Sequence, residues 1–347
     1  MSCETDVDLN ADYQDITIVY GLIDPNDTVH YLKINKAFLG ETNVNANDLA
    51  AIESNFNYAA DELDVTVEEY NKQNDLVTTH TTIRTVNEIP KDPGIFDNST
   101  NVLYKFITTS INRDNTFKLK IYNAKENKEI EAETKIVKKA SVDDPSPTAK
   151  WRFWASSEAV DEHVVVSTKP DMGRVQCIVQ FNYIEHYTTA SGKPSVEKTV
   201  EMNLGEIKTT TSLGGESMEW ILKGETFFDN IVSGVPSPSS IADFSHRELD
   251  NISMQFNVAG TELSTYMEVE APSTSVNQDK PNYTNLSNAI GIFSSREIML
   301  WESTIDPQTQ NQVNLHNETI TRLQSLNLGF CFGTTGVGFP VAPCVQL

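Results

Sequence analysis

The chain has 347 residues, of which 39% are hydrophobic, and 49 acidic against 26 basic residues give it a formal net charge of −23. This length allows two domains with separate cores, because a single core stops growing near ~250–300 residues. The charge excludes nucleic-acid phosphates and anionic lipid headgroups as direct partners, since both would be repelled. We interpret the charge as a solubility feature of the surface; carboxylate clusters that bind calcium are the alternative.

The first candidate functional feature is a cysteine near the N-terminus. Cys3 is followed by a run rich in acidic residues, and a thiol in this position is not expected to join a buried core. No stretch approaches the ~18 apolar residues of a membrane-spanning helix, and no basic segment with an apolar core precedes Cys3. We therefore expect Cys3 to be the lipid-attachment site of a bacterial lipoprotein, with residues 1–15 as its tether.

Residues 16–140 are predicted to form an immunoglobulin-like β-sandwich. The region contains short runs with period-two alternation or many β-branched residues, separated by turn residues such as Asp24–Asp27. Short strands at this spacing are typical of such a sandwich. A helix is expected at 47–56, where apolar residues recur at helical spacing. The predicted strands are 16–23, 29–34, 63–70, 76–86, 101–107 and 116–122.

A second β-rich domain is predicted for residues 150–347. Residues 141–149 concentrate Pro, Ser and Asp, which is the composition of a linker. The predicted strands beyond it are 163–167, 174–184, 196–204, 249–258 and 263–269, and the predicted helices lie at 217–233 and around 320–326. The expected fold is therefore mainly β: an N-terminal immunoglobulin-like sandwich followed by a larger antiparallel β domain with one or two short helices.

No pattern in the chain predicts a catalytic, cofactor or metal site. The six histidines lack metal-ligand spacing, no GxSxG motif occurs, and the glycine-rich segments lack the lysine of a phosphate-binding loop. A hydrolase that uses dispersed carboxylates is left as a third functional class behind two kinds of binding protein. Cys177 is predicted to be a buried, inert thiol, while Cys331 and Cys344 would pair as a disulfide only if the compartment is oxidising.

Three aromatic residues after the linker are the candidate ligand platform. Strand alternation places Trp151 and Phe153 on one side and Trp154 on the other. Packing in a core is the simpler interpretation of these side chains. The alternative is that Trp151 and Trp154 are exposed and stack against sugars.

Short segments of the chain resemble a family of uncharacterised Bacteroidetes outer-membrane lipoproteins. The resemblance is carried by Cys3 with its acidic neighbours, the strands Val19–Ile23 and Val29–Ile34, and the late segment Asn288–Ser295. It implies an immunoglobulin-like N-terminal domain, a larger β domain, and a lipid anchor at the outer membrane with the chain exposed at the cell surface. It supplies no catalytic residues.

Together these patterns predict a non-enzymatic, surface-anchored lipoprotein that acts as a binding component of a cell-envelope assembly. Its expected partner is an envelope or outer-membrane protein, its only membrane contact the lipid at Cys3, and it needs no cofactor. The alternative is an accessory protein for nutrient uptake that captures oligosaccharide through exposed aromatic side chains such as Trp151 or Trp154.

Overall fold

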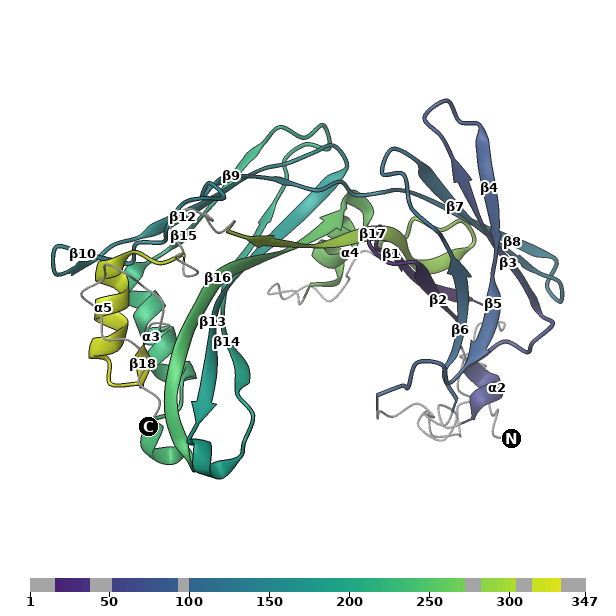
Figure 1. The fold of residues 1–347 in the computed structure, drawn as a ribbon. Helices are drawn as coiled ribbons and strands as arrows, with labels where there is room; N and C mark the ends of the chain where they lie inside the picture. Colours follow the sequence, from purple (N-terminus) through teal and green to yellow (C-terminus); the bar gives the residue numbers. More distant parts are fainter. Residues whose placement is uncertain (1–15, 38–51, 93–99, 272–281, 304–313, 332–347) are drawn as a thin grey trace, which may run out of the picture. The chain divides into compact units, whose positions relative to one another are not determined.

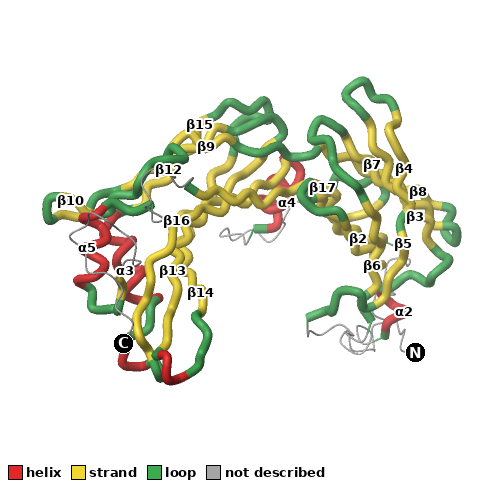
Figure 2. The backbone as a smooth tube through the Cα atoms, in the orientation of Figure 1, coloured by secondary structure: helices red, strands yellow, loops and turns green. Residues whose placement is uncertain are grey.

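The computed structural model describes residues 16–37, 52–92, 100–271, 282–303 and 314–331, and strands dominate it (Figure 1; Figure 2). The prediction of a mainly β fold is confirmed. The chain forms two compact units, Met1–Val137 with Ala259–Arg296, and Lys138–Val258 with Glu297–Leu347. Each unit therefore combines two separate stretches of sequence.

The predicted domain limits differ from these units in two ways. The second domain was expected to run through 150–347 without interruption, whereas Ala259–Arg296 belong to the first unit. Within the predicted linker 141–149, Ser141–Asp144 form strand β9 of a three-stranded sheet. A segment rich in Asp and Ser can still pair as a strand when its neighbour supplies the hydrogen bonds, because β-propensity depends strongly on context.

The first unit contains two sheets. The strands of the first sheet are, in order, β17 (Ala289–Glu302), β1 (Thr17–Ile23), β2 (Val29–Lys36), β6 (Val102–Ile107) and β5 (Ile83–Val86). Only the part of β17 up to Arg296 belongs to this unit. The second consists of β4 (Leu76–Thr81), β3 (Leu63–Tyr70), β7 (Thr116–Asn123) and β8 (Lys128–Lys135). Two helices, α2 (Glu53–Phe56) and α4 (Thr261–Glu270), accompany them.

One hydrophobic core joins the two sheets of the first unit. Alternate residues along each strand are buried, because successive side chains of a strand point to opposite faces. The buried side chains from the two sheets form one cluster that includes Val19, Ile34, Val67, Leu119 and Phe293. Two sheets that share one core in this way make a β-sandwich; its immunoglobulin-like character stays a prediction.

The sandwich of the first unit is completed by a strand from late in the sequence. β1 pairs in parallel with β17, in a register that joins Thr17 to Ala289 and Ile23 to Ser295. On its other side β1 pairs antiparallel with β2. The predicted sandwich of residues 16–140 therefore lacked the segment that provides the neighbour of β1.

The second unit is built on long strands and a smaller sheet. Its long strands are, in order, β14 (Val196–Lys208), β13 (Met172–Tyr187), β16 (Phe244–Gly260) and the end of β17. The part of β16 up to Val258 belongs to this unit. A short strand, β18 (Phe330–Cys331), pairs in parallel with β16. The smaller sheet has the order β15 (Ser217–Leu222), β12 (Glu162–Ser167) and β9. Two further strands, β10 (Trp154–Ala155) and β11 (Glu158–Ala159), form a separate hairpin. The helices are α3 (Gly224–Gly234) and α5 (Asn317–Ser325).

Two of the predicted elements have the wrong type. Ser217–Leu222 is a strand, with strictly alternating burial, and the helix expected at 217–233 begins only at Gly224. Residues 263–269, predicted as a strand, lie in helix α4. Apolar residues alternate there, but Leu, Met and three Glu residues favour a helix, and this propensity prevails once β16 ends at Gly260. The helix predicted around 320–326 is confirmed as α5.

A buried histidine in the first unit should make the stability of this unit sensitive to acid. His30 is buried, its Nε2 lies 3.0 Å from Thr108 Oγ1, and its ring stacks on Phe106. Burial lowers the pKa of His30 below its ordinary value of 6.5, and this effect outweighs the opposing influence of Asp27 and Asp24. The unfolded chain therefore binds this proton more readily, so the contribution of His30 to stability is complete above pH 6.5 and decreases as the pH falls below it.

We expect the stability of the first unit to decrease as the pH falls below about 6.5, the ordinary pKa of histidine. The measurement is urea unfolding followed by hydrogen exchange of β1 and β2 amides. His30→Gln should flatten the dependence of stability on pH, whereas His163→Gln, at a half-exposed ion pair with Glu219 in the second unit, should leave it unchanged. If the stability of His30→Gln depended on pH as steeply as that of the wild type, His30 would not be the source of the acid sensitivity.

Candidate functional site

A continuous extended segment, Leu76–Val86, forms the edge of both sheets of the first unit. Its first part, β4, pairs only with β3, and its second part, β5, pairs only with β6 among the described strands. The switch between the sheets occurs at Thr82, whose backbone N–H and hydroxyl both donate to the carbonyl of Val65. We call residues 76–86 the edge segment.

The edge segment lacks lysine and proline, two of the usual protections of a sheet edge. Proteins commonly protect an edge strand with lysine, proline or an inward-pointing charge. β4 has the sequence LVTTHT and β5 the sequence IRTV, so Arg84 is the only formally charged residue of the two strands. Leu76, Val77, Ile83 and Val86 are each 50–54% exposed. Within the described part of the chain, the outer backbone groups of the segment therefore have no strand partner, and apolar side chains flank them.

A second candidate lies in the second unit, where a tight hairpin presents Trp154. Trp154 and Ala155 pair with Ala159 and Glu158, and the two residues of the turn, Ser156 and Ser157, have positive φ values of 50° and 69°. Two successive residues at positive φ are the geometry of a type I′ turn, in which Asn and Gly are usual. Serine at both places stores backbone strain, which is found preferentially at functional positions.

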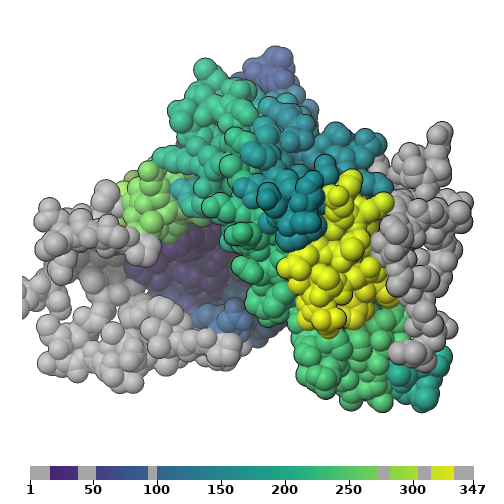
Figure 3. Space-filling view, turned by 90° about the vertical axis from the view of Figure 1, so that its left-hand side faces the viewer, coloured from purple at the N-terminus to yellow at the C-terminus, as the bar shows by residue number. Residues whose placement is uncertain are grey.

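Helix α5 holds the hairpin and supplies the main partner of Trp154. The Trp154 backbone N–H donates to Thr319 Oγ1, and Arg152 forms an ion pair with Glu318. The guanidinium of Arg322 lies over the Trp154 ring, 4.7 Å from its centroid, and 5.8 Å from the ring of Phe228. Figure 3 shows the segment 314–331, which contains α5, at the surface of the molecule in yellow. We call the pair of Trp154 and Arg322 the Trp154 ridge.

Two open hollows adjoin the Trp154 ridge. The α5 hollow, of about 460 Å³, is lined besides the ridge mainly by hydroxyl and amide side chains: Ser156, Ser157, Asn317, Thr321 and Ser325. Its only carboxylate, Glu318, is the one already paired with Arg152. The α3 hollow, of about 760 Å³, is acidic and also contains Lys223; its carboxylates are Glu158, Asp161, Glu225 and Asp229.

A half-buried carboxyl and a close-packed glycine lie at the base of this region. Glu162 accepts a hydrogen bond from the backbone N–H of Arg152, and burial raises the pKa of the Glu162 carboxyl. Gly224 begins α3 where a Cβ would lie 2.4 Å from the Val160 carbonyl oxygen. The residues that flank the hairpin are therefore packed closely against the start of α3.

The structure separates the two predicted platform residues. Trp151 is 1% exposed and stacks on Phe153, which in turn stacks on Phe227 of α3 with ring centroids 3.8 Å apart. Trp151 therefore belongs to the core, and its assignment to an exposed platform is wrong. Trp154, which points to the other side, is partly exposed and lines both hollows.

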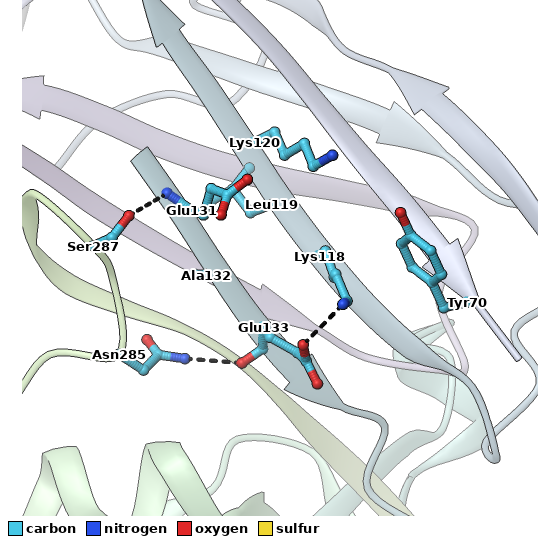
Figure 4. A pocket seen from close by; sticks show the side chains of 9 residues that line it. All are labelled: Tyr70, Lys118, Leu119, Lys120, Glu131, Ala132, Glu133, Asn285 and Ser287. Carbon is cyan, nitrogen blue, oxygen red and sulfur yellow. Dashed lines mark hydrogen bonds and ion pairs between the residues drawn. The ribbon is translucent and has the colours of Figure 1, made fainter. Parts of the chain in front are cut away.

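A third hollow, of about 440 Å³, lies on the outer face of β7 and β8 in the first unit (Figure 4). Both of its lysines are paired: Lys118 with Glu133 at 3.2 Å, and Lys120 with Glu68. Lys118 also lies over the ring of Tyr70, whose pKa is raised because its hydroxyl donates to Glu68. Cross-strand pairs of this kind support a solvated sheet face, and neither lysine is left to bind an anion.

The structure also joins Ser195 and His186, which are close in sequence, to the distant carboxylate of Glu248. Ser195 Oγ lies 2.8 Å from His186 Nδ1, and His186 Nε2 lies 3.1 Å from Glu248. A second imidazole, His246, stacks on His186, and burial followed by the nearby His186 lowers the pKa of His246. Ser195 is exposed, so water competes for these contacts, and we interpret the chain as a surface hydrogen-bond network. Nothing in the local sequence around these residues predicts their meeting.

The cysteine predictions fall partly outside the described residues. Cys3 and Cys344 lie outside them. Cys331 is disulfide-bonded and Cys177 is a buried free thiol, as predicted, with burial raising its pKa to about 12. The partner of Cys331 therefore lies outside the described residues, and its pairing with Cys344 stays a prediction.

No group of three or more His, Cys, Asp or Glu residues in the described part of the chain could hold a metal ion. No helix in that part of the chain is long and apolar enough to cross a membrane.

No protein-family model and no curated protein matches this chain. Among solved structures, it is similar to the crystal structure of the C-terminal globular domain of an oligosaccharyltransferase from Pyrococcus abyssi, with 10% sequence identity and a TM-score of 0.17. The match covers 60% of this chain and only 39% of that one. A likeness at this level establishes neither a shared fold nor a shared function.

Proposed function

We propose that this protein is a non-catalytic lipoprotein, anchored at the outer membrane through Cys3, that binds another cell-envelope protein by strand addition. The observation that carries the proposal is the unprotected edge segment. Its two strands end their sheets and contain neither lysine nor proline. An extended segment of a partner can add to such an edge, gaining affinity from backbone hydrogen bonds and specificity from side chains that contact alternate positions.

The edge segment favours a peptide-like partner over a flat protein surface. Its exposed apolar residues flank the backbone groups and do not form a broad patch, so a partner strand rich in β-branched or aromatic residues would match them. Because the chain has a net charge of −23, a strongly acidic partner would be repelled. The expected partner is therefore an envelope protein with an exposed extended segment of neutral or basic character.

A charge placed on the edge segment should abolish this interaction. We expect Val77→Lys and Ile83→Lys to weaken partner binding at least about tenfold, because an interfacial lysine would be desolvated without a counter-charge. The measurement is photo-crosslinking from position 77 in intact envelopes, followed by affinity isolation of the wild-type and variant proteins. Leu213→Lys is the matched control, since Leu213 is 80% exposed and lies in the second unit.

Equal recovery of the partner with Val77→Lys and with Leu213→Lys would contradict strand addition at this edge. The anchor is tested in the same cells. Cys3→Ser should move the protein from the membrane fraction to the soluble fraction, because the lipid is attached through the thiol sulfur. Retention of Cys3→Ser in the membrane fraction would contradict the anchor and leave the edge-segment result intact.

A further inference from the structure

The Trp154 ridge of the second unit combines the features of a site for an acidic sugar. Carbohydrate rings stack on exposed indole faces, and their hydroxyls bind to amide and hydroxyl side chains. Trp154 lines the α5 hollow together with four serine or threonine hydroxyls and the amide of Asn317. The edge segment lies in the first unit and contributes nothing to this hollow, so the two proposals are independent.

Arg322 gives the α5 hollow its charge preference. Within the described part of the chain Arg322 forms no ion pair, and its Nε is buried without a hydrogen-bond partner. Only its Nη1 has a side-chain partner, Ser325 Oγ at 3.3 Å. Stacking on Trp154 and Phe228 holds the planar guanidinium in place, so little conformational freedom remains to be lost when an anion binds.

The carboxylates around the ridge direct an anion to one side. Four of them line the α3 hollow, which would repel an anion. In the α5 hollow the one carboxylate, Glu318, is paired with Arg152 at 3.1 Å. An anionic group is therefore favoured beside Arg322 in the α5 hollow, and uncharged parts of the same ligand can extend along Trp154 toward the α3 hollow.

We propose that the α5 hollow binds an oligosaccharide that contains a uronic acid, with the sugar ring against Trp154 and its carboxylate on Arg322. A guanidinium binds a carboxylate through two parallel N–H donors, which a lysine in the same place cannot reproduce. The hydroxyl side chains of the hollow match the hydroxyls of the sugar ring and have no counterpart on an aliphatic acid.

The test uses the full chain and a matched pair of probes. A xylotriose that carries one glucuronic acid and the methyl ester of the same compound share the same rings, and only the first carries a carboxylate. Titration calorimetry should show the acid binding about tenfold tighter than the ester, as expected for one charge-assisted hydrogen-bonded contact. Arg322→Gln should remove this preference while keeping the affinity for the ester, and Trp154→Ala should remove binding of both.

Further variants separate a lost contact from a lost fold. Arg322→Lys keeps the charge without the planar fork and should retain only part of the preference. Arg113→Gln removes an arginine of the first unit, which hydrogen-bonds Asn26, and should bind as the wild type does. Trp154→Phe keeps an aromatic packing partner for Phe228, so it replaces Trp154→Ala in the binding measurement if Trp154→Ala fails to fold.

Three results would overturn the proposal. The first is no binding of either probe by the folded wild type. The second is an acid preference that survives in Arg322→Gln. The third is tighter binding of a peptide that contains one glutamate than of the glucuronic-acid-bearing xylotriose, which would assign the hollow to acidic peptides.

Discussion

Arg247→Ala is expected to destabilise the second unit by about 3–5 kcal/mol, because it leaves a buried carboxylate without its partner. Arg247 is fully buried, and its Nη2 and Nε both donate to Glu185 Oε2, at 2.9 and 3.1 Å. It also donates to the carbonyls of Pro236 and Leu328, and its guanidinium lies 4.8 Å from the ring centroid of Phe244. One side chain thus ties β13 and β16 to the segment that leads into β18.

All four tryptophans, Trp151, Trp154, Trp220 and Trp301, lie in the second unit, so tryptophan fluorescence during urea unfolding reports this unit selectively. Lys193→Ala, which breaks a half-exposed ion pair with Asp243, is the control and should cost less than about 1 kcal/mol. The double variant Glu185→Leu with Arg247→Met should recover most of the lost stability, because a well-packed apolar pair can replace a buried ion pair. Equal effects of Arg247→Ala and Lys193→Ala would contradict this role.

Gly291→Ala is expected to destabilise the first unit by about 2–5 kcal/mol, through backbone strain and overpacking together. Gly291 lies in β17 with a φ of +113°, a conformation that other residues rarely adopt. A Cβ at this position would lie 2.0 Å from the carbonyl oxygen of Val19, its partner in the parallel pairing of β1 with β17. The substitution therefore forces these two strands apart.

Hydrogen exchange of β1 amides measures the loss, and tryptophan fluorescence should show the second unit unchanged. Gly192→Ala is the matched control, because Gly192 also has a positive φ, +66°, but no atom lies within 4 Å of its added Cβ. Its cost should be about 1–2 kcal/mol from the left-handed conformation alone. Wild-type protection of β1 in Gly291→Ala would show that the contact with Val19 is easily relieved.

Local patterns predicted most strands because alternation is itself a local signal. The runs at 63–70 and 116–122 became β3 and β7 nearly residue for residue. The pairing of Thr17 with Ala289 depends on two segments at opposite ends of the chain, and no periodicity within either specifies it. Alternation also misled the prediction at residues 263–269, where apolar residues alternate as in a strand but the structure has a helix.

The candidate sites were predictable only to the extent that strand alternation applied. It separated Trp154 from Trp151 and Phe153, and the structure shows the same separation. The sequence did not reveal that Arg322, in the helix predicted around 320–326, stacks on Trp154, since that contact joins residues from distant segments. The edge segment was predicted as a strand at 76–86, but its position at the end of both sheets follows only from the topology.

The return of the chain to the first unit has a consequence for synthesis. While a ribosome is still translating the residues of the second unit, β1 has β2 beside it but not β17, because residues 289–296 do not yet exist. During that interval β1 is an open strand edge, and such edges invite pairing with other chains. The first unit therefore cannot complete its fold before residues 289–296 have been synthesised, because each unit combines two separate stretches of sequence.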